Sequence, residues 1–204
     1  MLRKDGFILA RWNKIFIIMH INSATGLLGD ARQVPSPNCD ARPDGNPVDL
    51  LVIHAISLPT GEFGGPWIDA LFCNRLDPAA HPDFADICQL TVSAHALIRR
   101  DGEIIQYVPF QQRAWHAGRS QFQGREACND FSIGVELEGC DDKPFELIQY
   151  QQLARLARTL MHTYPGISPG RITGHSDIAP GRKTDPGPHF DWPQFQRLLT
   201  ETQD

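Results

Sequence analysis

Apolar runs alternate with amphipathic stretches along this chain, and that alternation predicts strands mixed with helices. Residues 49–58, DLLVIHAISL, form a continuous apolar run rich in branched side chains, which is typical of a strand buried on both faces. Residues 131–139, FSIGVELEG, instead place apolar side chains on one face and polar side chains on the other. We therefore expect a fully buried strand in the first segment and a half-buried strand in the second.

Helical spacing appears in three stretches. Between residues 146 and 163 apolar residues recur every three or four positions, and a Pro-Gly pair follows as a stop signal. Residues 65–72 are typical of a short helix with a proline in its first turn. Residues 191–201 predict a closing helix with an aspartate as its N-cap. The chain should therefore contain one long helix and two shorter ones.

A hairpin is expected around Asp101-Gly102, because a D-G pair between two strand-like runs is a strong hairpin signal. A further short β-like stretch, RIT, occupies residues 171–173. Strands mixed with helices, including one antiparallel pair, favour a mixed central β-sheet flanked by helices. Since 204 residues fit one domain, the sequence predicts a single-domain α/β protein.

Charge and hydropathy narrow the range of partners. The net charge is −5 and the pI about 5.9, with acidic and basic residues interleaved, so no basic stripe suggests a nucleic acid. No apolar run approaches the roughly 20 residues that a membrane span requires. We expect a soluble protein, monomeric by default, that has neither a nucleic acid nor a membrane as its partner.

Two features favour the cytoplasm. The five cysteines are widely spaced and include no C-x-x-C pair, which argues against a disulfide framework and a structural zinc knot. The early apolar run IFIIMHI is short, is interrupted by His20, and lacks the pattern of a secretory signal. The simplest interpretation is a protein of the reducing cytoplasm.

Reactive side chains gather in the segment HSDIAPGRKTDPGP, whose prolines and glycines lead us to expect neither a helix nor a central strand. It contains His175 and Asp185, while His54 ends the apolar run LLVI. Two imidazoles and one carboxylate are a common ligand set for catalytic zinc, with a fourth position open to water. The compact H-E-x-x-H spacing is absent, so a hydrogen-bonded buried histidine and an aspartate in a turn remain alternatives.

Five motifs together resemble one enzyme family. VIHAISLP, VSAHALIRRDG, WHAG, FSIGVELEG and GHSDIAPGRKTDPGP occur in an order and spacing similar to those of the AmpD-type anhydro-muramyl-peptide amidases. These zinc enzymes are related to phage lysozyme-type amidases and to peptidoglycan recognition proteins. The resemblance runs from about Gly29 to the C-terminal helix. It implies the same fold, with zinc held by His54, His175 and Asp185.

The resemblance also implies two catalytic residues, Glu136 and Lys183. Glu136 would take a proton from the attacking water and later deliver it to the departing amine. Lys183 would stabilise the tetrahedral oxyanion together with the metal. The residues alone leave other interpretations open: Lys183 as a solvated cation paired with Asp177 or Asp185, and Glu136 with Glu138 as the wet face of an edge strand.

Trp115 and His116, in the motif WHAG, are candidates for substrate binding, because an aromatic ring beside an imidazole suits a groove for a sugar or peptide. Taken alone, Trp115 is more typical of a core or rim residue. His95, within VSAHALI, is either an outer support of the metal site or a buried histidine with satisfied hydrogen bonds.

Two departures from the family pattern stand out. Residues 1–20 resemble an extension ahead of the amidase domain, which we expect over residues 21–204, and MHINSATG at Met19 resembles an ordinary start. Ala55 stands where the family often has asparagine, so any hydrogen bond from that amide must come from elsewhere.

The sequence therefore predicts a zinc amidase that cleaves the lactyl-L-alanine amide of 1,6-anhydro-muramyl peptides during cell-wall recycling, with a small-molecule muropeptide as its substrate. One alternative is an exported amidase acting on polymeric peptidoglycan. Another is a module that binds muramyl peptides without cutting them. Such modules typically lose a zinc ligand, and here all five residues of the catalytic set are present.

Overall fold

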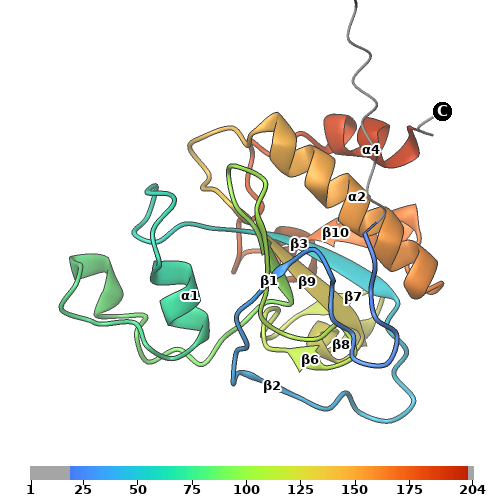
Figure 1. The fold of residues 1–204 in the computed structure, drawn as a ribbon, viewed down its shortest axis with the longest axis horizontal. Helices are drawn as coiled ribbons and strands as arrows, with labels where there is room; N and C mark the ends of the chain where they lie inside the picture. The colour runs from blue at the N-terminus through green and yellow to red at the C-terminus, as the bar shows by residue number, and fades with distance from the viewer. Residues whose placement is uncertain (1–18, 202–204) are drawn as a thin grey trace, which may run out of the picture.

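A six-stranded mixed sheet forms the centre of the protein in a computed structural model that describes residues 19–201 (Figure 1). Neighbouring strands of this sheet form five pairs. Four of the pairs are parallel, and only β4 and β5 run antiparallel. The sheet order is β1 (Arg32–Gln33), β5 (Ile104–Gln106), β4 (Ala96–Ile98), β9 (Ser132–Glu138), β3 (Leu50–Ile56) and β10 (Ile172–Gly174). Two small antiparallel sheets are added: β2 (Cys39–Asp40) with β6 (Arg113–Ala114), and β7 (Gln121–Phe122) with β8 (Arg125–Glu126).

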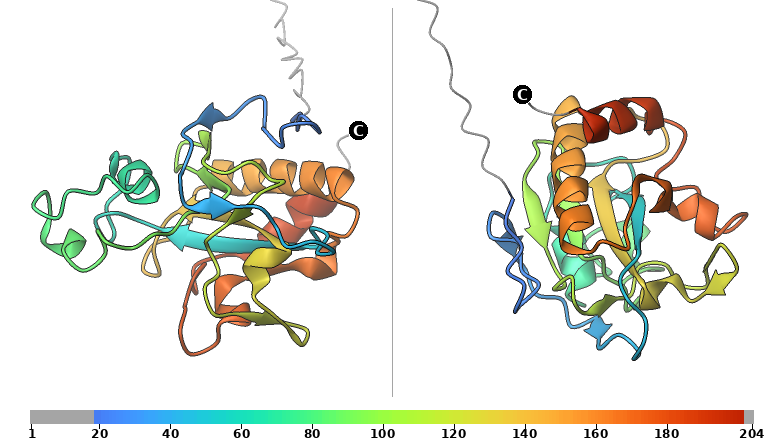
Figure 2. Two further views of the ribbon diagram at one scale, coloured as in Figure 1. Left: turned by 90° about the horizontal axis from the view of Figure 1, so that it is seen from below. Right: turned by 90° about the vertical axis from the view of Figure 1, so that its right-hand side faces the viewer.

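Helices flank the sheet, as the sequence predicts. The long helix α2 (Leu147–Thr163) lies across one face, and α4 (Trp192–Thr200) packs against it (Figures 1 and 2). The remaining helices are α1 (Trp67–Phe72), the single turn α3 (His175–Ile178) and three 3₁₀ turns over Pro82–Phe84, Cys128–Asp130 and Pro169–Arg171. The expected α/β architecture is therefore confirmed.

The predicted elements are present with small shifts of their ends. The strand expected at 49–58 is β3, the hairpin at Asp101-Gly102 joins β4 to β5, and Gly102 adopts the positive φ of 89° that its turn requires. The N-cap prediction for the closing helix is also confirmed, since the Asp191 side chain accepts a hydrogen bond from the Gln194 N–H at 2.8 Å. The hydrophobic periodicity and the capping and turn residues were therefore sufficient to predict these elements.

Two expectations are wrong. The strand predicted as half-buried is β9, and all of its residues are buried because it lies between β3 and β4 and is paired with both. The segment expected to be without helix begins with α3. This turn forms because the Asp177 side chain accepts hydrogen bonds from the Gly174 N–H and the Thr173 hydroxyl, each at 2.9 Å.

The two faces of the sheet have different roles. Toward α2, Ile53 of β3 and Val135 of β9 pack with Leu153 and Leu160 of the helix in the largest apolar cluster. On the opposite face the apolar residues give way to polar ones, because alternate positions of β3 and β9 lead to His54 and Glu136. That face also carries a smaller apolar cluster, which contains Leu50 and Val52 of β3, so His54 and Glu136 lie at the edge of a buried region.

Near the N-terminus, the described chain packs onto this framework. Met19 and Ile21 are buried in the largest apolar cluster, and Ile21 forms a β-bridge with Leu28. Residues 1–18, which make up most of the predicted extension, lie outside the described residues. Over residues 19–201, no helix is both long enough and apolar enough to cross a membrane.

The α2 face provides a matched test of the core. Leu153 is fully buried, whereas Leu147 in the same helix is 56% exposed. We expect Leu153→Ala to lower the free energy of unfolding by about 2–5 kcal/mol, since it leaves a cavity. Leu147→Ala should change it by less than about 0.5 kcal/mol. Urea unfolding of both variants checks this, and equal losses would contradict the assigned core.

Candidate active site

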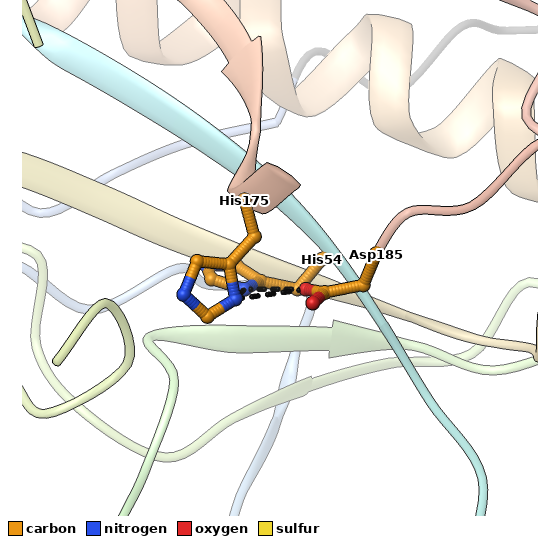
Figure 3. Close-up of side chains that lie close together, drawn as sticks. All are labelled: His54, His175 and Asp185. Atoms are coloured by element: carbon orange, nitrogen blue, oxygen red, sulfur yellow. Dashed lines mark hydrogen bonds and ion pairs between the residues drawn. The ribbon is translucent and has the colours of Figure 1, made fainter. Parts of the chain in front are cut away.

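Three side chains from separate parts of the chain converge on one point beside the sheet (Figure 3). His54 extends from β3, His175 is the first residue of α3, and Asp185 lies in the following loop. The Nδ1 atoms of the two histidines are 3.0 Å apart, and each is 3.0 Å from Oδ2 of Asp185. These three donor atoms form a nearly equilateral triangle.

Strand pairing brings these residues together. β10 runs parallel to β3 with Gly174 opposite Ile53, so the residues that follow them, His175 at the start of α3 and His54 in β3, lie side by side. The loop then returns, because the Ser176 N–H donates to the Asp185 carbonyl at 2.9 Å. His54 is 1% and His175 3% exposed, so both imidazoles are held rigidly within the fold.

The protonation of this cluster fits a metal site. Nε2 of His175 lies 3.2 Å from the Ala117 carbonyl, which only accepts, so Nε2 carries the proton of the neutral ring. Its Nδ1 lone pair therefore faces the Asp185 carboxylate, and these two electron-rich atoms repel unless a cation lies between them. Ligand atoms bound tetrahedrally at about 2.0–2.1 Å are roughly 3.3 Å apart, close to the observed spacing.

The charge states suit the same role. Burial lowers the pKa of His54 to about 4, so its imidazole is neutral near pH 7. Burial by itself raises the pKa of the Asp185 carboxyl, but the neighbouring imidazoles of His175 and His54 hold that pKa below its ordinary value. Two neutral imidazoles and an ionised carboxylate are the forms that bind a divalent metal ion.

Glu136 lies beside this cluster, directly opposite His54 in the pairing of β9 with β3. It is 8% exposed, and its Oε2 has no hydrogen-bond partner among the described residues. Burial raises the pKa of the Glu136 carboxyl well above its ordinary value, the Asp185 charge raises it further, and the Lys183 charge lowers it. A buried carboxyl with a free oxygen is suited to hold and release a proton.

Lys183 is exposed in the loop between α3 and Asp185, and its charge lowers the pKa values of both His54 and Glu136. The alternative was an ion pair of Lys183 with Asp177 or Asp185. Among the described residues, Asp177 instead caps α3 and Asp185 faces the histidines. Within residues 19–201, no ion pair joins Lys183 to a carboxylate. Its ammonium group is therefore available beside the cluster.

Glu138 has a different environment from Glu136. Its carboxylate forms an ion pair with Arg99 at 2.9 Å and accepts hydrogen bonds from the Gly64 and Arg100 N–H groups. The interpretation of both glutamates as the wet face of an edge strand is wrong, because β9 is central and Glu138 is 2% exposed. The raised pKa of Glu136 comes from burial and Asp185, whereas Glu138 serves to hold the loop at Gly64.

The two predicted substrate-binding residues lie next to the cluster. His116 contacts it directly, with Nδ1 2.9 Å from Nε2 of His54. Trp115 is half-buried, and its backbone N–H donates to the Ser93 hydroxyl at 3.1 Å. Substrate contact by either residue stays a prediction.

Of the two interpretations of His95, the structure supports a buried histidine whose hydrogen bonds are satisfied within the protein. Its Nδ1 accepts a hydrogen bond from the Gly134 N–H at 3.0 Å, and its Nε2 lies 3.1 Å from the Gln112 carbonyl and from Arg42. The histidine that contacts His54 of the cluster is instead His116. Gly134 carries the only sequence signal for this contact, since a glycine inside a strand often marks the close approach of another group.

Comparison with known proteins identifies the family. A family model described as N-acetylmuramoyl-L-alanine amidase matches residues 44–188, a range that includes the whole cluster with Glu136 and Lys183. The chain belongs to the N-acetylmuramoyl-L-alanine amidase family. The resemblance carried by the five sequence motifs is therefore confirmed.

Individual relatives of this amidase cover most of its length. The 1,6-anhydro-N-acetylmuramyl-L-alanine amidase AmpD of Escherichia coli K12 is 64% identical over 176 residues, which cover 86% of this chain and 96% of the relative. The crystal structure of a selenomethionine AmpD derivative matches with a TM-score of 0.86 and 61% identity, covering 89% of this chain and 100% of that one.

A third similar protein has been solved with a muropeptide. The amidase AmiD from E. coli, in complex with the substrate anhydro-N-acetylmuramic acid-L-Ala-D-gamma-Glu-L-Lys, matches with a TM-score of 0.55 and 33% identity. The match covers 76% of this chain and 59% of that chain. The relationship therefore extends to a protein whose ligand is an anhydro-muramyl peptide.

The cluster predicts stabilisation by a divalent metal ion. At a free zinc concentration 100 times the dissociation constant, binding adds about 2.7 kcal/mol, which corresponds to a rise in Tm of roughly 5–10 °C for a chain of this size. Asp185→Ala should abolish the rise, whereas Asp44→Ala, in an exposed loop, should preserve it. Thermal unfolding with and without zinc measures this, and an equal rise in Asp185→Ala would exclude the cluster as the site.

Proposed function

We propose that this protein is a zinc-dependent N-acetylmuramoyl-L-alanine amidase that hydrolyses the lactyl-L-alanine amide of 1,6-anhydro-muramyl peptides in cell-wall recycling. The convergence of His54, His175 and Asp185 beside the Glu136 carboxyl carries the proposal. Relatives that are 55–64% identical and named for this activity support the substrate class. The complex of AmiD with an anhydro-muramyl peptide supports it as well.

We assign zinc to His54, His175 and Asp185, because two imidazole nitrogens and one carboxylate oxygen are a donor set that zinc prefers. When bound, zinc supplies a Lewis acid that lowers the pKa of water from about 15.7 to around 7. The neutral imidazole of His54 and the lowered pKa of Asp185 support this assignment.

Glu136 acts as the proton carrier. It removes a proton from the attacking water as the water oxygen bonds to the amide carbon, and delivers that proton to the nitrogen as the C–N bond breaks. The products are the lactyl carboxylic acid and the free amine of L-alanine. The raised pKa of the buried Glu136 carboxyl supports the second step, since an ordinary carboxylate holds a proton too weakly near pH 7.

Lys183 stabilises the negative charge that develops on the amide oxygen. Its charge lowers the pKa values of His54 and Glu136, which supports an ammonium group close to the reacting atoms. A donor of this kind is typically worth about 10²–10³ in kcat. Its exposed position in the loop leaves it free to approach a bound substrate.

Other expectations belong to this proposal. Trp115 and His116 line the substrate groove, residues 21–204 form the amidase domain, and residues 1–20 are an extension. The protein acts in the cytoplasm, because an enzyme of recycling encounters small muropeptides and not the intact wall. It acts as a monomer.

Activity and metal dependence are tested in one experiment. Purified protein is incubated with anhydro-muramyl tripeptide, with and without a zinc chelator, and the free peptide is measured by mass spectrometry. We expect cleavage that the chelator abolishes and added zinc restores. Cleavage that resists the chelator would exclude the zinc mechanism. Preferential cleavage of polymeric wall favours an exported amidase, and cleavage of neither substrate favours a binding module.

Variants of the two catalytic residues separate chemistry from metal binding. Glu136→Gln removes the proton carrier at nearly constant shape, so kcat should fall about 10²–10⁴-fold. Lys183→Ala should lower kcat about 10²–10³-fold. Zinc content should stay at the level of the unsubstituted protein in both. Glu201→Gln, at an exposed residue beyond α4, is the control and should retain full activity. Full activity in Glu136→Gln would remove Glu136 from the mechanism.

A further inference from the structure

Behind the cluster, a chain of hydrogen bonds leads away from His54. Its Nε2 lies 2.9 Å from Nδ1 of His116, and Nε2 of His116 lies 3.1 Å from the Ser132 hydroxyl oxygen. Ser132 is fully buried at the start of β9. Both nitrogens of the His116 ring are therefore occupied by protein groups, one of which is a proposed zinc ligand.

Only one arrangement of protons along this chain suits a metal site. If Nδ1 of His54 presents a lone pair to the cluster, its Nε2 carries the proton and donates to Nδ1 of His116. His116 then carries its own proton on Nε2, which donates to the Ser132 oxygen. An acceptor at Nδ1 of His116 thus selects the His54 tautomer that binds metal.

We propose that His116 is a positioning residue for the metal centre, which fixes the tautomer and ring orientation of His54. The inference rests on the proposed function, because it assumes that the cluster binds zinc. It goes beyond that function by giving His116 a role apart from substrate contact. Outer hydrogen bonds of this type typically contribute about 10–100-fold to metal affinity.

The backbone next to His116 supports the second histidine ligand. The Ala117 carbonyl accepts the hydrogen bond from Nε2 of His175. The Asn129 side-chain oxygen in turn accepts from the N–H groups of His116 and Ala117, at 3.1 and 2.8 Å. Two consecutive residues therefore orient both imidazole ligands, and a single asparagine holds them in place.

Gly134 makes room for this arrangement. It lies in β9 on the face that carries Ser132 and Glu136, and a Cβ atom added there would come within 2.5 Å of Cγ and Nδ1 of His116. Any larger residue would push the imidazole off its line to His54. A glycine therefore occupies this interior position of a buried strand because the His116 ring lies against it.

The test compares zinc affinity among variants of His116, by competition with a chromophoric chelator. We expect the dissociation constant to rise about 10–100-fold in His116→Ala. His116→Asn, whose amide oxygen can reach the position of Nδ1, should recover most of the affinity. Gly134→Ala should weaken binding by displacing the ring. His162→Ala, at an exposed residue in the last turn of α2, is the matched control and should leave affinity unchanged.

Each outcome decides between the roles. If His116→Ala keeps the zinc affinity and only raises KM, His116 is a substrate contact alone and the inference is overturned. If His116→Asn loses as much affinity as His116→Ala, the hydrogen bond is not the cause and the inference is also overturned. Circular dichroism of each variant establishes that it folds, and Ser132→Ala, with a smaller expected loss, replaces any that does not.

Failure of the underlying function gives a different result. If the unsubstituted protein binds no zinc, both the zinc mechanism and this inference are wrong. If it binds zinc and cleaves the tripeptide, but zinc affinity is the same in all His116 variants, only the positioning role is wrong.

Discussion

The parallel pairing of β3 with β10 on one side and with β9 on the other is the constraint on which the site depends. The first pairing sets His175 beside His54, and the second sets Glu136 opposite it. Each residue belongs to, or directly follows, a hydrogen-bonded strand, so their relative positions are set by the sheet. Asp185 alone comes from a loop, and the hydrogen bond from Ser176 ties that loop to α3.

Burial on the polar face of the sheet has opposite consequences for two glutamates of one strand. Glu138 is neutralised by Arg99 and by two backbone N–H groups, and it serves as an anchor for the Gly64 loop. Glu136 lies two residues earlier, with one oxygen unpaired, and its pKa is raised by burial and by the nearby Asp185 charge. The side chains around each carboxyl, rather than its place in the β9 alternation, decide how it is paired.

One short segment contacts both histidines of the cluster. Nδ1 of His116 lies 2.9 Å from Nε2 of His54, and the Ala117 carbonyl lies 3.2 Å from Nε2 of His175. Because both contacts come from consecutive residues, a displacement of that segment would change the surroundings of both imidazoles together. The sequence suggested His95 as such a support, with a buried, hydrogen-bonded histidine as the alternative, and its bonds go to Gly134, Gln112 and Arg42.

By itself, the sequence determined the strand 49–58, the hairpin, the helices, and the family with its five candidate residues, because periodicity, turn residues and motifs are local properties. Only the tertiary structure decided that β9 is buried on both faces, since burial depends on the neighbours that the sheet order brings to it. Tertiary structure also decided that Asp177 caps a helical turn and that His116 contacts His54. Contacts between residues 62 positions apart leave no periodic trace in a sequence.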